Sequence, residues 1–184
     1  RPAARARLEE AGRAAAGDEA AGTAAPGARV RWIGLHPGAA NSLKCWPLDR
    51  FVALGAALAT HSRAGEERRL VVFDAPRERG RAAAVHAGLV ARGVRAGFVP
   101  AGGIAEFAAA CAALDLLACN DSGVVHVAAA LRVASVSFHA LGDPAEWGPR
   151  HPHAATFWAP RAIETLPVEP AVEAAERLLA GPPG

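Results

Sequence analysis

Lysine is almost absent from this sequence. Of its 20 Lys+Arg residues only Lys44 is a lysine. Arginine presents a rigid fork of donors, whereas lysine is a compact, mobile charge that can follow a phosphate. The arginines are scattered, no basic stripe alternates with aromatics, and the net charge is only +2. These features argue against a nucleic-acid or membrane-surface partner, and the single lysine indicates a chemical requirement in its own loop.

Other features are missing too. The three cysteines have no paired spacing, and two of them, Cys111 and Cys119, fall in apolar runs that suit small buried side chains in a reducing compartment. No run reaches the roughly 18–20 apolar residues of a membrane helix. No cluster has metal-ligand spacing, and we interpret the HPH run at 151–153 as a surface turn. There is no methionine, so we expect a piece of a longer or processed protein.

What is present is an alternation of apolar strands and helices. We expect residues 1–28 to be a polar helix and a linker that arrives from a missing N-terminal domain, and 29–184 to be one nucleotide-sugar-binding domain. The predicted strands are 30–36, 70–73, 95–99, 115–119, 133–138 and, weakly, 156–158. The predicted helices are 48–62, 77–92, 104–114, 121–131 and 170–180, with an irregular stretch over 141–149. This pattern predicts an α/β fold, a Rossmann-like doubly wound parallel sheet.

Two unusual loops follow the first and fourth of these strands. Residues 36–47 read HPGAANSLKCWP and residues 120–130 read NDSGVVHVAAA, and between them they hold the only two asparagines of the chain. In the common strand order 3-2-1-4-5, the first and fourth strands are central neighbours whose connections leave toward opposite faces. The two loops are therefore predicted to form the two lips of one crevice.

The chemistry of these loops suits a diphosphate. Ser122 and Gly123 begin a helix whose free N–H groups favour an anion, and glycine allows its backbone to come close. Lys44 would supply the main counter-charge. His126, one turn into the helix, could donate a hydrogen bond to the same anion.

Each of these residues also has an ordinary structural interpretation. Asp121 or Ser122 could simply cap the helix, His126 could be a core histidine, and Lys44 could be a surface residue. Trp46 and Pro47 are interpreted as packing and helix-start residues. The functional interpretation is favoured because all of the candidates converge on one predicted crevice.

The two loop sequences, together with DPAEWGP at 143–149, resemble the C-terminal half of glycosyltransferase family 9, the heptosyltransferases of bacterial lipopolysaccharide biosynthesis and related enzymes. The resemblance runs from about residue 30 to 149. It implies a B-type glycosyltransferase of paired Rossmann-like domains, in which this half binds a nucleotide-sugar donor, usually ADP-heptose. It also implies inverting transfer to a lipopolysaccharide-type acceptor held by the missing N-terminal domain, and no required cofactor.

The resemblance assigns roles by position. Lys44 would neutralise the diphosphate, the amides of Ser122 and Gly123 would cradle it, His126 would sit nearby, and Asp121 would contact sugar hydroxyls. We expect Glu78, with Asp74 as second choice, to hold the ribose, and the loop at Gly102 to lie against adenine. The resemblance implies a cytoplasmic protein and leaves open a place at the inner face of the inner membrane.

Departures from the family limit these expectations. Cys45 stands where the family often has a basic residue, and the catalytic base lies in the absent half, so the chain alone is expected to be inactive. Two alternatives stay open. One is a dinucleotide-dependent oxidoreductase, although the first loop lacks a Gly-x-Gly-x-x-Gly fingerprint. The other is a non-catalytic nucleotide-sugar-binding module.

Overall fold

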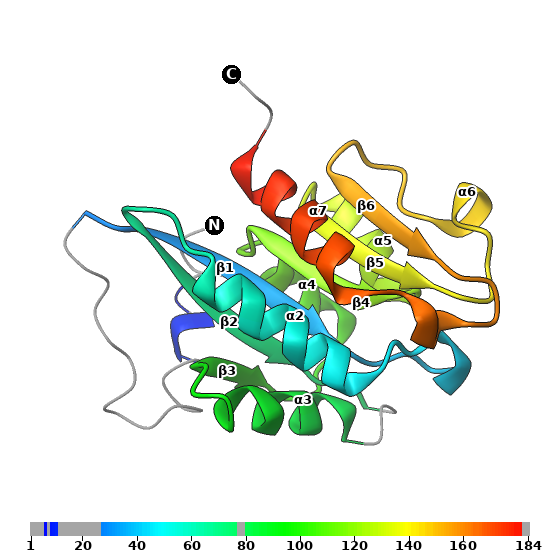
Figure 1. Cartoon of the computed structure of the whole chain (residues 1–184), viewed down its shortest axis with the longest axis horizontal. Helices are drawn as coiled ribbons and strands as arrows, with labels where there is room; N and C mark the ends of the chain where they lie inside the picture. The colour runs from blue at the N-terminus through cyan, green and yellow to red at the C-terminus, as the bar shows by residue number, and fades with distance from the viewer. Residues whose placement is uncertain (1–5, 7, 11–26, 77–79, 182–184) are drawn as a thin grey trace.

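The computed structural model describes residues 6, 8–10, 27–76 and 80–181. It contains a six-stranded, all-parallel sheet in the order β3-β2-β1-β4-β5-β6 (Figure 1). The strands are β1 (Arg29–His36), β2 (Glu66–Phe73), β3 (Ala96–Val99), β4 (Leu116–Asn120), β5 (Ala134–His139) and β6 (Ala154–Trp158). The predicted central order 3-2-1-4-5 is confirmed, and the weakly predicted last strand forms the edge beside β5.

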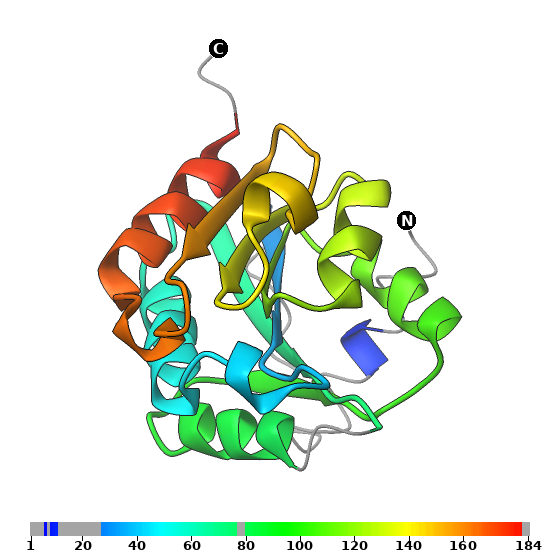
Figure 2. The ribbon, with the colours of Figure 1, turned by 90° about the vertical axis from the view of Figure 1, so that its right-hand side faces the viewer.

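Helices cover both faces of the sheet, as a doubly wound fold requires. One face carries α2 (Leu48–Thr60), α3 (Arg81–Val90) and α7 (Val168–Ala180), and the other carries α4 (Ile104–Cys111) and α5 (Gly123–Ala130) (Figure 2). The remaining helical turns are η1 (Ser42–Lys44), α6 (Pro144–Trp147) and η2 (Ile163–Thr165). Figure 2 looks onto the carboxyl edge of the strands, where η1 and α6 lie.

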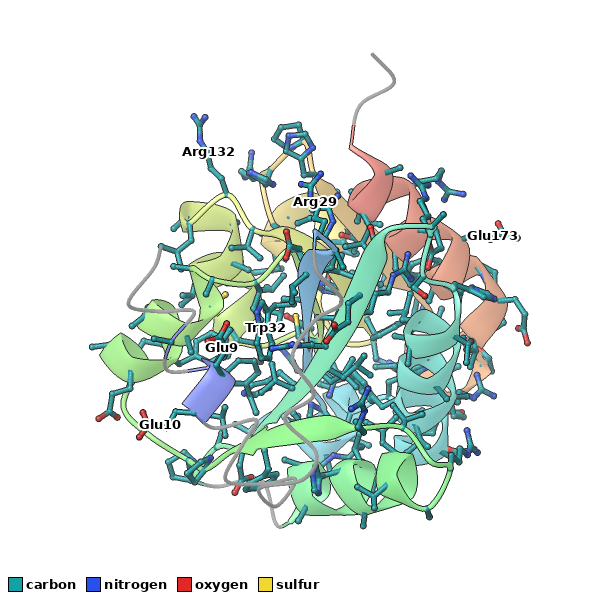
Figure 3. The ribbon with its side chains drawn as sticks, turned by 90° about the vertical axis from the view of Figure 1, so that its left-hand side faces the viewer. Glu9, Glu10, Arg29, Trp32, Arg132 and Glu173 are labelled. Carbon is teal, nitrogen blue, oxygen red and sulfur yellow. The ribbon has the colours of Figure 1, made fainter. Side chains whose placement is uncertain are left out.

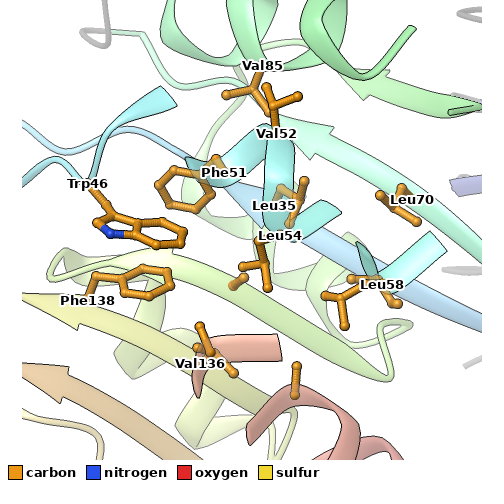
Figure 4. Close-up of a cluster of buried hydrophobic side chains, with 14 of the residues drawn as sticks. Leu35, Trp46, Phe51, Val52, Leu54, Leu58, Leu70, Val85, Val136 and Phe138 are labelled. Atoms are coloured by element: carbon orange, nitrogen blue, oxygen red, sulfur yellow. The ribbon is translucent and has the colours of Figure 1, made fainter. Parts of the chain in front are cut away.

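The larger apolar core lies under α2, α3 and α7. At its carboxyl end Trp46 is fully buried and stacks on Phe138, with ring centroids 3.8 Å apart and an interplanar angle of 15° (Figure 4). Phe51 of α2 meets both rings edge-on. Trp46 is therefore a packing residue, as predicted, and it anchors the loop after β1 to the core.

A second core lies on the opposite face, against α4 and α5. Leu8 belongs to it, only 1% exposed, in the same cluster as Trp32 of β1. Residues 6 and 8–10 are helical, and Figure 3 shows this short segment, marked by Glu9 and Glu10, against this side of the sheet. The polar helix expected within residues 1–28 thus has its described part packed on the domain. The rest of that helix, and the linker, lie outside the described residues.

Two predicted elements differ in detail. The helix predicted over 77–92 is described from Arg81, after Gly80 at a left-handed φ of 73°. The stretch predicted as irregular contains α6, because Asp143 caps it by accepting from the Ala145 amide at 2.8 Å and Pro144 occupies its first turn.

Candidate functional site

Asn120 joins the two loops at the carboxyl edge of the sheet. It is the last residue of β4 and is fully buried. Its Oδ1 accepts from the Trp46 amide at 2.9 Å, and its Nδ2 donates to the Pro37 carbonyl at 2.8 Å. The predicted convergence of the loops after β1 and β4 is confirmed, and a buried amide holds them together.

A second set of contacts fixes the loop after β1 from the other side. Arg81, the first residue of α3, donates from Nε to the Pro37 carbonyl at 2.9 Å and from Nη2 to the Trp46 carbonyl at 2.8 Å. The indole Nε1 of Trp46 donates to the Leu166 carbonyl at 3.0 Å. The loop that carries Lys44 is therefore held at both ends before any ligand is present.

Lys44 and Asp121 form an ion pair between the two loops. Lys44 ends η1, whose first turn is capped by Asn41 Oδ1 accepting from the Leu43 amide at 3.0 Å. Lys44 Nζ lies 2.7 Å from Asp121 Oδ2, with side chains 31% and 7% exposed respectively. Lys44 is thus not a simple surface lysine. It is partly exposed and lies against a nearly buried carboxylate.

The N-terminus of α5 is left without a side-chain cap. Ser122 occupies the N-cap position in an extended conformation, but its hydroxyl makes no capping hydrogen bond. The interpretation of Asp121 or Ser122 as a cap is therefore wrong, because the Asp121 carboxylate is directed at Lys44 instead. A Cβ added at Gly123 would meet nothing within 4 Å, so the space beside this residue is open. Unpaired helical amides with open space before them form a ready anion site.

Two histidines near this ion pair differ in burial. His126 of α5 is exposed, so its interpretation as a core histidine is wrong. His139, the last residue of β5, is fully buried and was not predicted as a site residue. Its Nε2 lies 2.9 Å from Ser137 Oγ and its Nδ1 lies 3.7 Å from Asp121 Oδ1. A signal existed: Ser135, Ser137 and His139 alternate as polar residues along an otherwise apolar strand.

The groups around His139 shift its pKa in opposite directions. Burial lowers the pKa of His139, the Asp121 carboxylate opposes that shift, and the charges of Lys44 and His126 reinforce it. Burial also lowers the pKa of His36, at the end of β1, to about 4. Both buried rings are therefore neutral at physiological pH.

The expected nucleoside contacts are only partly visible. Asp74 follows β2 and Gly102 follows β3, so both lie at the carboxyl edge that carries the diphosphate candidates. The Asp74 amide donates to the Val99 carbonyl at 2.9 Å, which brings the two strand ends together. Gly102 is exposed. Glu78, the first choice for the ribose, lies outside the described residues.

In the described part of the chain, no group of three or more His, Cys, Asp or Glu side chains could hold a metal ion. In the same residues, no helix has the length and apolar character to cross a membrane.

Comparison with known proteins decides the family. The sequence model of glycosyltransferase family 9 (heptosyltransferase) matches residues 2–169. The chain belongs to glycosyltransferase family 9. A search of curated proteins found no match.

Solved structures of this family share the fold. The glycosyl transferase family 9 protein of Veillonella parvula is 21% identical with a TM-score of 0.71, over 96% of this chain and 51% of its own. ADP-heptose LPS heptosyltransferase II of E. coli is 20% identical with a TM-score of 0.69, over 82% and 46%. E. coli heptosyltransferase WaaC with ADP is 20% identical with a TM-score of 0.67, over 80% and 44%. The family 9 chain thus has the Rossmann-like fold of these proteins and spans about half their length.

Proposed function

We propose that this family 9 chain is the nucleotide-sugar-binding half of an inverting glycosyltransferase, with ADP-heptose or a related nucleotide-sugar as donor. The observation that carries the proposal is the pairing of Lys44 with Asp121 beside the uncapped start of α5. A cation, a carboxylate and free helical amides meet within one crevice. The heptosyltransferases with ADP and with an ADP-heptose analogue, whose fold this chain shares, agree with that donor class.

Each group has a distinct proposed role. The Lys44 ammonium and the amides of Ser122 and Gly123 bind the diphosphate and stabilise the charge that develops on it as it leaves. His126, exposed on the first turn of α5, donates to the same anion. Asp121 accepts hydrogen bonds from hydroxyls of the transferred sugar. These groups stabilise a leaving nucleoside diphosphate without a metal ion or another cofactor.

The nucleoside would extend from the diphosphate toward the ends of β2 and β3. Glu78 or Asp74 would accept from the ribose hydroxyls, and the backbone at Gly102 would lie against adenine. Residues 29–184 are proposed as the nucleotide-sugar domain and 1–28 as the connection to a partner half. That half would carry the catalytic base and a lipopolysaccharide-type acceptor, so this chain alone would not turn over. Such a reaction would take place in the cytoplasm of a bacterium, or at the inner face of its inner membrane.

Calorimetric titration with ADP tests the proposal. We expect the folded chain to bind ADP with a Kd of about 1 mM or tighter, and Lys44→Ala to weaken binding at least about tenfold, because the main counter-charge is lost. Arg92→Ala is the matched control, since this exposed cation follows α3 at the opposite edge of the sheet. A folded chain that ignores millimolar ADP would overturn the proposal. NADH binding that an ADP-sugar cannot displace would instead favour an oxidoreductase.

A further inference from the structure

The Asp121 carboxylate lies between two groups that can carry positive charge. Lys44 Nζ is 2.7 Å from Oδ2, and His139 Nδ1 is 3.7 Å from Oδ1. The first distance is that of a close ion pair without hydrogen-bond geometry at Oδ2, and the second is too long for a hydrogen bond. One carboxylate oxygen thus has a cation beside it, and the other faces a neutral ring at a distance that a small side-chain movement would close.

A bound diphosphate would change the pairing of Asp121 with Lys44. In the proposed function Lys44 serves the diphosphate as well as Asp121, and its ammonium is exposed enough to turn toward the ligand. Asp121 is 7% exposed, so solvent compensates poorly for the lost partner. An unpaired carboxylate at that depth is strongly disfavoured, and without a partner its orientation toward the sugar hydroxyls is no longer fixed.

His139 is placed to replace Lys44 as the partner of Asp121. Its Nε2 already lies 2.9 Å from Ser137 Oγ, whose hydroxyl oxygen can accept from a protonated ring. In the described residues the charged or titratable groups that act on it are Asp121 at the end of β4, Lys44 of η1 and His126 of α5. On β6 its register partner is Trp158, which carries no charge. The cation that opposes protonation is the same Lys44 that a diphosphate would draw away.

We propose that His139 is a positioning residue for Asp121: when a diphosphate draws Lys44 away, His139 takes one proton from solvent and holds the carboxylate in place for the sugar. The inference rests on the proposed function. The step is a proton uptake that forms one N–H bond on the ring and makes or breaks no other covalent bond. Its consequence is that donor binding and proton binding are linked.

The first test needs no ligand. Histidine ring signals of the full chain are titrated by NMR in the wild type and in Lys44→Met, with His139→Asn used to assign the His139 signal. We expect the pKa of His139 to rise by at least about one unit in Lys44→Met, because the opposing cation is gone and Asp121 remains. An unchanged His139 titration would overturn the coupling, whether or not the chain binds ADP.

The second test measures protons directly. Calorimetry with ADP in buffers of different ionisation enthalpy at about pH 7 should show uptake approaching one proton per ADP in the wild type. Uptake should vanish in His139→Asn, which keeps a neutral donor near the Nδ1 position. It should persist in His126→Asn, even though that variant binds ADP more weakly. Uptake that persists in His139→Asn would overturn the inference, and so would its loss in His126→Asn alone. Absence of any ADP binding would overturn the proposed function and leave the NMR titration to decide.

The third test separates positioning from general damage. His139→Leu should weaken an ADP-sugar at least about fivefold more than ADP, because Asp121 is proposed to contact only the sugar. His139→Asn should restore most of that difference, since it supplies a donor to Asp121. Thermal unfolding checks that both variants are folded. Equal losses for ADP and the ADP-sugar in a folded His139→Leu protein would contradict a positioning role.

Discussion

The two asparagines of the chain have different structural roles. Asn41 is exposed and caps one turn of η1, whereas Asn120 is fully buried and bridges the loops after β1 and β4. Both stood out in the sequence as rare residues in the two loops. Only the structure separates them, because burial and partners 74 residues away are not visible in a local pattern.

Replacing Asn120 by alanine should therefore destabilise the fold far more than replacing Asn41. Asn120→Ala leaves the buried Trp46 amide unpaired and removes one of the two donors to the Pro37 carbonyl, and we expect a loss of about 2–4 kcal/mol. Asn41→Ala removes one exposed cap and should cost about 0.5–1 kcal/mol. Urea denaturation of both variants measures the difference. Equal losses would show that Asn120 does not bridge the loops in solution.

Sequence reasoning reached part of the site and stopped at a definite point. Strand order alone predicted that Lys44, Asp121 and His126 lie on neighbouring loops, and the Lys44–Asp121 ion pair agrees with that prediction. Sequence reasoning did not predict that Lys44 and Asp121 contact each other. It also did not predict that the buried His139 lies near Asp121. Such ion pairs depend on the directions of side chains at strand ends, and the hydrophobic periodicity of a sequence carries no information about those directions.

Among the helices and strands, α5 is the element whose start forms the proposed anion site. Its N-cap hydroxyl does not close the first turn, and Gly123 leaves open space where a side chain would begin. Gly34 of β1 is the opposite case. A Cβ there would lie 2.6 Å from Leu114 Cδ1 and 2.9 Å from Phe73 Cε2, inside the second core. One glycine leaves room for solvent or ligand, and the other lets the core close over the strand.

Alanine at these two glycines should separate binding from stability. Gly123→Ala should change the free energy of unfolding by no more than about 0.5 kcal/mol, since the methyl group meets no protein atom. It should weaken ADP at least about fivefold, because the methyl enters the space proposed for the diphosphate. Gly34→Ala should cost about 1–3 kcal/mol through overpacking. Denaturation and calorimetry on both variants test this. A Gly123→Ala protein with undiminished ADP binding would place the anion elsewhere.

At the scale of the whole molecule, the alternation of strands and helices was enough to predict the architecture. Parallel strands buried on both faces read as short apolar runs, and chain handedness leaves few ways to connect them. The α6 turn was missed because it depends on the local Asp143 cap and not on periodicity. The edge strand β6 was predicted, but only weakly, because Thr156 and Trp158 are exposed. Edge strands carry a weak hydrophobic signal because only one neighbour covers them.

The buried histidines should make stability depend on pH. The pKa of His36 is about 4 in the folded chain against 6.5 for the free side chain, so between these values the unfolded state binds more protons. Stability is therefore full above about pH 6.5 and falls as the pH is lowered toward 4, by up to about 3 kcal/mol for this residue. The lowered pKa of His139 acts in the same direction.

Urea denaturation at a series of pH values measures this slope. His36→Asn removes one titrating ring and should flatten the loss of stability between about pH 6.5 and 4, whatever its effect on stability at neutral pH. A second flattening is expected in His139→Asn. A slope that is the same in His36→Asn as in the wild type would show that His36 is not buried in its neutral form.

The ion pair at the rim of the crevice has a practical consequence. Since Lys44 is the sole lysine, its ε-amine is the only side-chain amine in the sequence, and it lies 2.7 Å from the Asp121 carboxylate. Lysine-directed acylation, or an isotope supplied as lysine, therefore marks a single side chain, and that side chain stands in the proposed ligand site. Lys44 supplies the positive charge of the proposed site, and a label on its side chain would report on ligands that bind there.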